Sequence, residues 1–197
     1  MKLNRFVAIV VVLCMIFGCT MTASAAGTPP IINRSFHLAE GISFTSTPRE
    51  NGDVLAGIPE AEIDMLDGNA RSTSLPTSFC DLSIQNYNAR MVTIAYSKLY
   101  TNSYFSPDER NELHLSFTVF TTHGGSGNLR VGIYNMSTGA ESYIDYSFTD
   151  AVSENAYFSN LNQGNHYAIY FQSISNGSGT AFMNGNALIF WPSTYFG

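Results

Sequence analysis

The sequence predicts an all-β fold, an antiparallel β-sandwich or jelly roll of roughly 8 strands preceded by a signal peptide. Short segments alternate apolar and polar residues with a period of two, the pattern of strands that are buried on one face. Clusters of Gly, Asn and Ser separate these segments at intervals of roughly 8 to 14 residues. Apolar residues do not recur at helical spacing over any window of about ten residues, which disfavours folds with helical crossovers.

The N-terminal residues 1–26 have the parts of a secretory signal peptide. Lys2 and Arg5 supply a positive charge, an apolar run of about a dozen residues follows, and the Ala-Ser-Ala at 23–25 offers a cleavage site. The run is shorter than the roughly 20 apolar residues that cross a bilayer, and no comparable run follows it. We therefore expect a secreted protein whose mature part, 27–197, is one domain without a transmembrane span.

Cys19 raises an alternative to free secretion. The stretch 16–19 ends in Gly-Cys and is similar to the site at which bacterial lipoproteins are cut and acylated, so a lipid anchor through Cys19 is the alternative location. Cleavage after the signal would leave Cys80 alone, and no intramolecular disulfide could form. We expect Cys80 to be a small buried hydrophobic residue on the same strand face as Leu82 and Ile84.

The charge of the chain disfavours one class of partner. The formal charge is −6, and cleavage would remove Lys2 and Arg5 but none of the 15 acidic residues, which makes it −8. A surface of this sign repels phosphate backbones, so nucleic-acid binding is not expected.

Strands are expected in chain order where the alternation is clear. The segments are 36–44, 80–84, 92–96, 112–120, 129–133, 144–148 and 167–171. The first is interrupted by Glu40 and Gly41. The clearest is 112–120, in which Leu113, Phe117 and Val119 point to the same face as Leu115.

A segment at about 45–78 does not follow the strand rhythm. It is acidic, contains three prolines and has few aromatic residues. We expect a long exposed excursion from the domain, with at most one short helix over 60–66 that begins after Pro59. An excursion of this length within a compact domain is uncommon.

Two stretches resemble segments of the pre-peptidase C-terminal domains, small β-sandwich modules attached to secreted bacterial enzymes. The first is Leu-Arg-Val-Gly-Ile-Tyr-Asn at 129–135, after a Gly-rich turn. The second is Leu-Asn-Gln-Gly-Asn-His-Tyr at 161–167, which leads into a strand. The resemblance covers under half of the chain and implies a non-catalytic accessory role.

Signatures of catalysis and of metal binding do not occur in the sequence. No Gly-x-Ser-x-Gly elbow is present, and the four histidines have neither the His-Glu-x-x-His spacing nor paired cysteines beside them. Glu112 and Asp145 fall on the outward faces of their strands, as carboxylates of any soluble sheet do. We expect no cofactor, no metal site and no catalytic residue.

One group of residues suggests a binding surface instead. Tyr134 and Tyr170 fall on the polar side of their strands, beside Arg130 in one case and beside His166 and Gln172 in the other. Aromatic rings with neighbouring hydrogen-bonding groups suit a sugar, although extra tyrosines can also pack against a loop.

Three functions are expected in order of preference. The first is a secreted, non-catalytic binding or accessory module for a glycan or cell-surface ligand. The second is a structural or self-associating protein of the cell envelope or matrix that uses exposed sheet edges. A small secreted hydrolase comes third.

Overall fold

The computed structural model describes residues 32–49, 73–174 and 183–192, all within the compact unit Ile31–Gly197. The elements bounded there are strands. In chain order they are β1 (Asn33–His37), β2 (Ser43–Pro48), β3 (Ser78–Phe79), β4 (Tyr87–Ile94), β5 (Leu99–Tyr100), β6 (Ser103–Tyr104), β7 (Leu113–Thr121), β8 (Ser126–Asn135), β9 (Glu141–Thr149), β10 (Ala151–Ser159), β11 (Tyr167–Ser173) and β12 (Met183–Phe190). The expected signal peptide, Cys19 and the expected helix at 60–66 lie outside the described residues.

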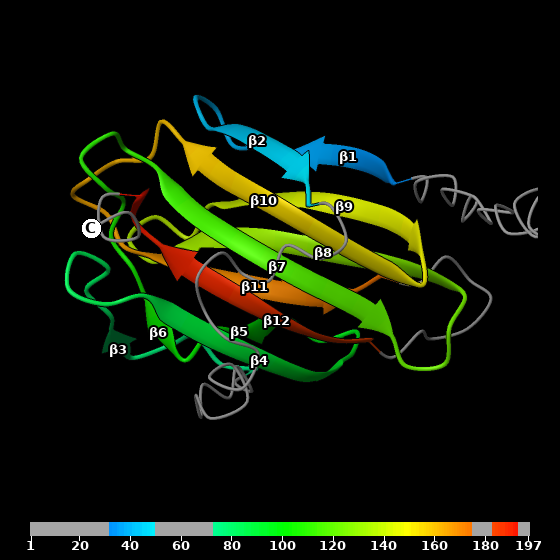
Figure 1. Ribbon diagram of the computed structural model, residues 1–197. Coiled ribbons are helices and arrows are strands. Elements are labelled where there is room, and N and C mark those ends of the chain that lie inside the picture. Colours follow the sequence, from blue (N-terminus) through cyan, green and yellow to red (C-terminus); the bar gives the residue numbers. More distant parts are fainter. Residues whose placement is uncertain (1–31, 50–72, 175–182, 193–197) are drawn as a thin grey trace, which may run out of the picture. The chain divides into compact units, whose positions relative to one another are not determined.

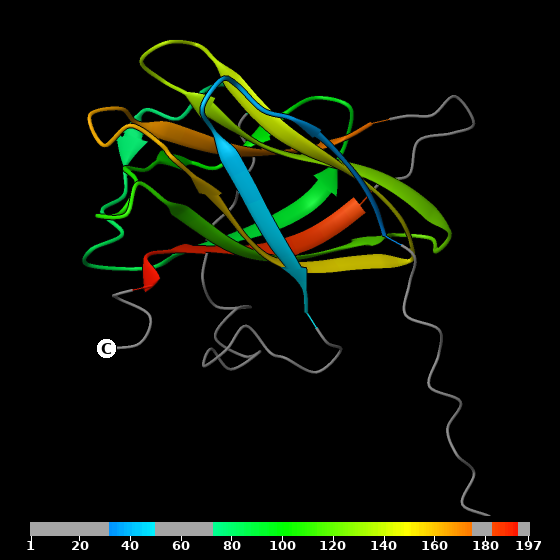
Figure 2. The ribbon, with the colours of Figure 1, turned by 90° about the horizontal axis from the view of Figure 1, so that it is seen from above.

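Ten of the strands form two antiparallel five-stranded sheets. Sheet A has the order β1-β9-β8-β11-β5, and sheet B has the order β2-β10-β7-β12-β4. Figures 1 and 2 show the sheets as two stacked layers. The all-β prediction is confirmed, and the two sheets hold more strands than the roughly eight expected. A separate parallel pair joins β3 to β6.

The core lies between the two sheets and consists of the alternate side chains of their strands. Leu113, Phe117 and Val119 are fully buried, which confirms the expected face of β7. The ring of Phe117 packs edge-on against Tyr146 of β9 and Phe171 of β11. Burial of such aromatic side chains is the main stabilising contribution in a domain without a disulfide.

Two strands of sheet B were not predicted. In β10 the inward positions include Glu154, a charged residue that interrupts the apolar alternation. In β12 the sequence 183–190 carries glycine and two asparagines, which hides the strand pattern. Both strands form because β7 pairs with β10 on one side and with β12 on the other.

The strand expected at 92–96 is offset by an irregularity. The pairing of β12 with β4 shifts between Met183 and Gly185, so one more residue is used on β4 than on β12. As a result Met91 and Ile94 are both buried, whereas Val92, which was expected on the face of Ile94, is only half-buried. Tyr96 lies beyond the end of β4, in a bend, and is 49% exposed.

The strand expected at 80–84 is a turn rather than a strand. Cys80 is buried as expected, and burial raises the pKa of its thiol. Backbone N–H groups of Ile84 and Gln85 donate to the Asp81 carbonyl, which turns the chain and leaves Ile84 80% exposed. The prediction for Ile84 was therefore wrong.

The excursion expected at 45–78 is shorter than its stated bounds. Residues 45–48 belong to β2, where they pair with β10, and Ser78 begins β3. Residues 50–72 lie outside the described part of the chain.

The Gly-rich turn between β7 and β8 is present, and Gly124 and Gly125 adopt positive φ angles there (72° and 89°) that favour glycine.

Candidate functional site

Four of the five residues singled out from the sequence lie on one face of sheet A, the outer face that points away from the core. Arg130 and Tyr134 are on β8, and Tyr170 and Gln172 are on β11. Gln172 is the cross-strand partner of Arg130, and Gly132 separates Arg130 from Tyr134 along β8. The sequence placed Tyr134 and Tyr170 on the polar side of their own strands, and both lie on the outer face of sheet A. The contacts of these four residues do not make an open binding surface.

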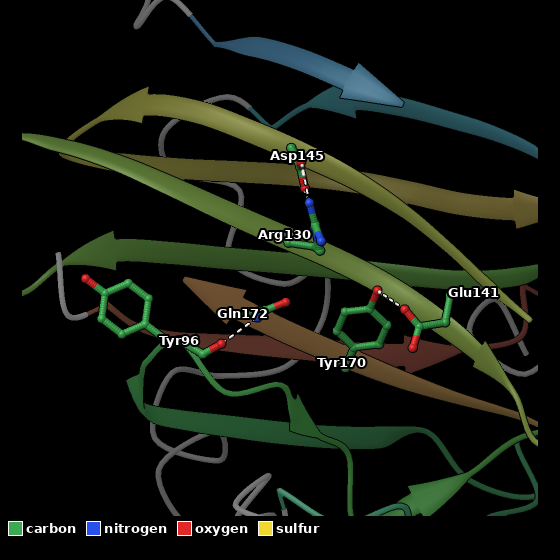
Figure 3. Close-up of polar contacts among 6 residues, drawn as sticks. All are labelled: Tyr96, Arg130, Glu141, Asp145, Tyr170 and Gln172. Atoms are coloured by element: carbon green, nitrogen blue, oxygen red, sulfur yellow. Dashed lines mark hydrogen bonds and ion pairs between the residues drawn. The ribbon is translucent and has the colours of Figure 1, made fainter. Parts of the chain in front are cut away.

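Arg130 is held by its neighbours on β9. Its Nε and Nη2 donate to the two carboxylate oxygens of Asp145 at 2.7 and 2.9 Å (Figure 3). Its guanidinium also lies 3.6 Å from the ring centroid of Tyr143. The hydrogen bond that Arg130 donates to Asp145 is the main cause that raises the pKa of Arg130. The guanidinium is thus committed to a bidentate pair.

Tyr170 is fully buried even though it lies outside the main core. Its ring covers Gly132, where an added Cβ would lie 2.4 Å from the ring. Its hydroxyl is 3.4 Å from Glu141 Oε2 (Figure 3), and Lys98 Nζ lies 4.9 Å from the ring centroid. Tyr170 forms a second small apolar cluster with Tyr100 and Ala168, so it is not available to a ligand.

The remaining three residues occupy separate positions. Gln172 Nε2 donates to the Tyr96 carbonyl (Figure 3), and Tyr134 is half-buried against Tyr100. The His166 ring contacts Phe79 and Tyr104 at the β3–β6 pair, with centroids 5.5 and 5.0 Å away. His166 therefore does not join Tyr134 and Tyr170 in one patch.

A pocket of about 210 Å³ lies instead on the outer face of sheet B. One wall is a row of cross-strand neighbours that crosses four strands: Thr45 on β2, Tyr157 on β10, His114 on β7 and Phe190 on β12. Cross-strand neighbours lie within about 5.5 Å of one another on a sheet, so the four side chains stand side by side.

The aromatic rings of this row contact one another. The rings of His114 and Tyr157 are stacked, with centroids 4.9 Å apart and planes at 22°. Phe190 lies on the other side of His114, with the ring centroids 5.7 Å apart. All three side chains are partly exposed, so the row offers the pocket an aromatic wall.

The opposite side of the pocket is polar. Two residues further along the strands, Thr47 and Asn155 are cross-strand neighbours, and both are exposed and line the pocket. Next to Asn155 lies Ser116, which is 5% exposed.

Hydrogen bonds fix the polar side. Arg49, the residue after β2, donates from Nη1 to Ser116 Oγ at 2.9 Å, and Ser116 Oγ donates to Asn155 Oδ1 at 2.6 Å. The Arg49 backbone N–H donates to the Ser153 carbonyl, which extends the pairing of β2 with β10. The orientation of the Asn155 amide is thereby set by a chain of bonds.

Acidic residues lie on the other side of the aromatic row. His114 Nε2 is 2.9 Å from Glu112 Oε2, and buried Asp108 accepts the Glu112 backbone N–H at Oδ1. One ligand atom of each of these three residues lies within 4.8 Å of the others. The spacing of the histidines in the sequence did not predict this cluster, because Asp108 is brought to it by the turn before β7.

Sequence reasoning missed the pocket because its lining comes from four strands that only the register brings together. The alternation did place His114 on the outer face of β7, which was the available signal. Glu112 and Asp145 lie apart: Asp145 is on β9 of sheet A, and Glu112 is the residue before β7 of sheet B.

Comparisons with protein-family models, with curated proteins and with solved structures found no match. A search of the described residues for helices long and apolar enough to cross a membrane found none.

Proposed function

We propose that this protein is a secreted, non-catalytic binding module that holds one sugar unit of a glycan in the pocket on sheet B. The observation that carries the proposal is the row of Tyr157, His114 and Phe190 beside the polar pair Thr47 and Asn155. A sugar presents apolar C–H groups and hydroxyls together, and this pocket offers an aromatic wall and hydrogen-bonding groups at one place.

The rigidity of the site supports the same function. Its residues lie on strands of an antiparallel sheet that pair with neighbours on both sides, apart from Thr45 and Thr47 on the edge strand β2. Side chains held by such a scaffold lose little freedom on binding, which favours affinity. The volume of about 210 Å³ suits one small ring rather than a long chain.

A glycan array followed by calorimetric titration of the best ligand tests the proposal. We expect Tyr157→Ala to weaken binding about tenfold or more, since it removes one ring of the wall, a loss of about 1.4 kcal/mol or more. The matched control is Tyr134→Ala on sheet A, also a half-buried outer-face tyrosine, which leaves the affinity unchanged. Absence of binding to every glycan, or equal losses in both variants, contradicts the proposal.

Two finer features belong to the same proposal. Export rests on the signal peptide expected at 1–26, with a lipid anchor at Cys19 as the alternative; mass spectrometry of the exported protein distinguishes the two.

We also propose a jelly-roll arrangement. From β4 onward, successive strands of the two sheets lie alternately in sheet B and sheet A. The exception is the pair β8 and β9, which form a hairpin within sheet A.

A second candidate function is self-association through the edge strand β1. Among the strands that the structure describes, β1 pairs with β9 alone, and Phe36 on it is 57% exposed. An exposed strand edge with an aromatic side chain can pair with another chain. Size-exclusion chromatography over a range of concentrations tests this function, and a monomer at every concentration contradicts it.

A further inference from the structure

We infer that Asp108, Glu112 and His114 form a binding site for one divalent transition-metal ion such as Zn²⁺. Asp108 and Glu112 belong to the turn that leads into β7, and His114 is the second residue of that strand. The site goes beyond the proposed function and does not depend on it, because the ion would lie on the side of the His114 imidazole that faces Glu112.

The three side chains already converge on one place. One ligand atom of each residue lies within 4.8 Å of the other two, and His114 Nε2 is 2.9 Å from Glu112 Oε2. Zinc binds imidazole nitrogen and carboxylate oxygen at about 2.0–2.2 Å, so the ligand atoms around one ion are about 3 to 4 Å apart. Binding of an ion between these three groups therefore needs little movement of the side chains.

The Asp108 carboxylate keeps one oxygen for an ion. Asp108 is only 6% exposed, and its Oδ1 accepts the backbone N–H groups of Arg110 and Glu112 at 2.9 and 2.8 Å. Its Oδ2 accepts no hydrogen bond from the residues that the structure describes, yet it is not one of their unpaired polar atoms that are closed off from solvent. A nearly buried carboxylate is costly unless its charge is compensated, and a cation that reaches Oδ2 from solvent compensates it.

The charge of this cluster favours a cation. Two carboxylates lie together, and no lysine or arginine within 32–49, 73–174 or 183–192 forms an ion pair with either of them. The neighbouring Arg110 is exposed and donates its backbone N–H rather than its guanidinium. The whole chain has a formal charge of −6, and a field of this sign attracts cations.

The ligands are held in place from two directions. The His114 ring is stacked on Tyr157, with planes at 22°, and contacts Phe190 on its other side, so its Nε2 faces Glu112. The Asp108 backbone N–H donates to the Glu112 carbonyl at 2.8 Å, which closes the turn that carries both carboxylates. Side chains that are fixed in advance lose little freedom when an ion binds.

The donor set selects the kind of ion. Ca²⁺ and Mg²⁺ prefer ligands that are all oxygen, whereas an imidazole nitrogen suits Zn²⁺ and its neighbours among the transition metals. Three protein ligands leave a coordination position for water, as in open zinc sites. The sequence predicted no metal site because the spacing of these residues matches no metal-binding motif.

Calorimetric titration of the untagged, chelator-treated protein with zinc chloride tests the inference. We expect one Zn²⁺ per chain and an unfolding temperature that rises with the zinc concentration, because an ion that binds only the folded state stabilises it. Glu112→Gln and His114→Gln should each weaken the binding of zinc about tenfold or more. These two variants are decisive, since Asp108 also holds its turn by hydrogen bonds. The matched control is His166→Gln, a histidine whose Nδ1 lies 3.1 Å from Ser106 Oγ, and it should leave the affinity unchanged.

Three results would overturn the site. The first is a titration without heat, together with an unfolding temperature that zinc does not raise. The second is an unchanged zinc affinity in Glu112→Gln and His114→Gln, with both variants folded by their circular dichroism spectra, or an equal loss in His166→Gln. The third is tighter binding of Ca²⁺ than of Zn²⁺, which contradicts a role for the imidazole. Failure to bind any glycan would overturn the proposed function alone.

Discussion

Arg34 and Glu154 form an ion pair that connects the two sheets, with Arg34 Nη2 2.5 Å from Glu154 Oε1. Arg34 lies on β1 of sheet A and Glu154 on β10 of sheet B. The Glu154 side chain is fully buried, whereas a quarter of the Arg34 side chain is exposed. The pair therefore fixes the edge strand β1 to the opposite layer and neutralises a buried carboxylate.

Removing the cation from this pair should destabilise the fold. We expect Arg34→Met to lower the free energy of unfolding by about 3 kcal/mol, because it leaves a buried carboxylate without its partner. The double variant Arg34→Met with Glu154→Leu should recover most of the loss, since the buried charge is gone as well. Urea unfolding of the three proteins measures both effects.

The matched control is Arg130→Met, which breaks a pair of similar geometry on the surface of sheet A. In the unmodified protein the side chains of Arg130 and Asp145 are 23% and 22% exposed. We expect a loss of about 1 kcal/mol or less. An equal loss in Arg34→Met and Arg130→Met would show that the buried pair has no special role.

The contact between Gly132 and Tyr170 leads to a second prediction. A Cβ on residue 132 would lie 2.4 Å from the Tyr170 ring, which is fully buried and cannot move aside freely. We expect Gly132→Ala to lower the stability by about 2 kcal/mol. Gly164→Ala is the control, because the neighbouring atom there belongs to the exposed side chain of Asn162; a loss as large as that of Gly132→Ala would contradict the contact.

The buried tyrosines lead to a third prediction, on alkaline pH. Burial is the main cause that raises the pKa of Tyr170 and Tyr146, with a smaller effect from the charges of Glu141 and Glu154. Both phenols stay protonated in the folded state when the unfolded chain already loses these protons, at about pH 10. The contribution of these two phenols to the free energy of unfolding is therefore complete below about pH 10, and it falls as the pH rises further.

Unfolding free energies measured between about pH 8 and pH 11 test this dependence. We expect the decline above about pH 10 to be shallower in Tyr170→Phe, which has one fewer group to ionise on unfolding. The exposed-surface control is Tyr96→Phe, in which the decline should match that of the unmodified protein. A Tyr170→Phe profile parallel to that of the unmodified protein would show that Tyr170 does not titrate as a buried phenol.

The sequence was most informative where apolar and polar residues alternate along a strand without interruption. In β7, Leu113 and Phe117 alternate with polar residues and are buried as predicted, because a strand has only two faces. It was least informative where a buried charge entered the pattern, as Glu154 does in β10. That residue is tolerated inside only because Arg34, 120 residues earlier, reaches it from the other sheet.

The candidate site shows the same limit. Tyr170 falls on the polar side of β11, but the glycine opposite it on β8 lets its ring lie flat on the sheet, where it is buried. The pocket depends on Thr45, His114, Tyr157 and Phe190 being neighbours in one row, a relationship set by three strand pairings. Alternation gives the face of each residue, but it does not give the register between strands.

A nuclear magnetic resonance titration of the ¹⁵N-labelled protein with oligosaccharides, beginning with the glycan that binds best on the array, is the sharpest test of binding in the sheet B pocket. If the ligand binds in this pocket, the amide shifts that change most belong to residues around it, such as Thr47, His114 and Tyr157. Changes centred on Arg130 and Tyr134 of sheet A, or a spectrum that no oligosaccharide alters, would contradict it.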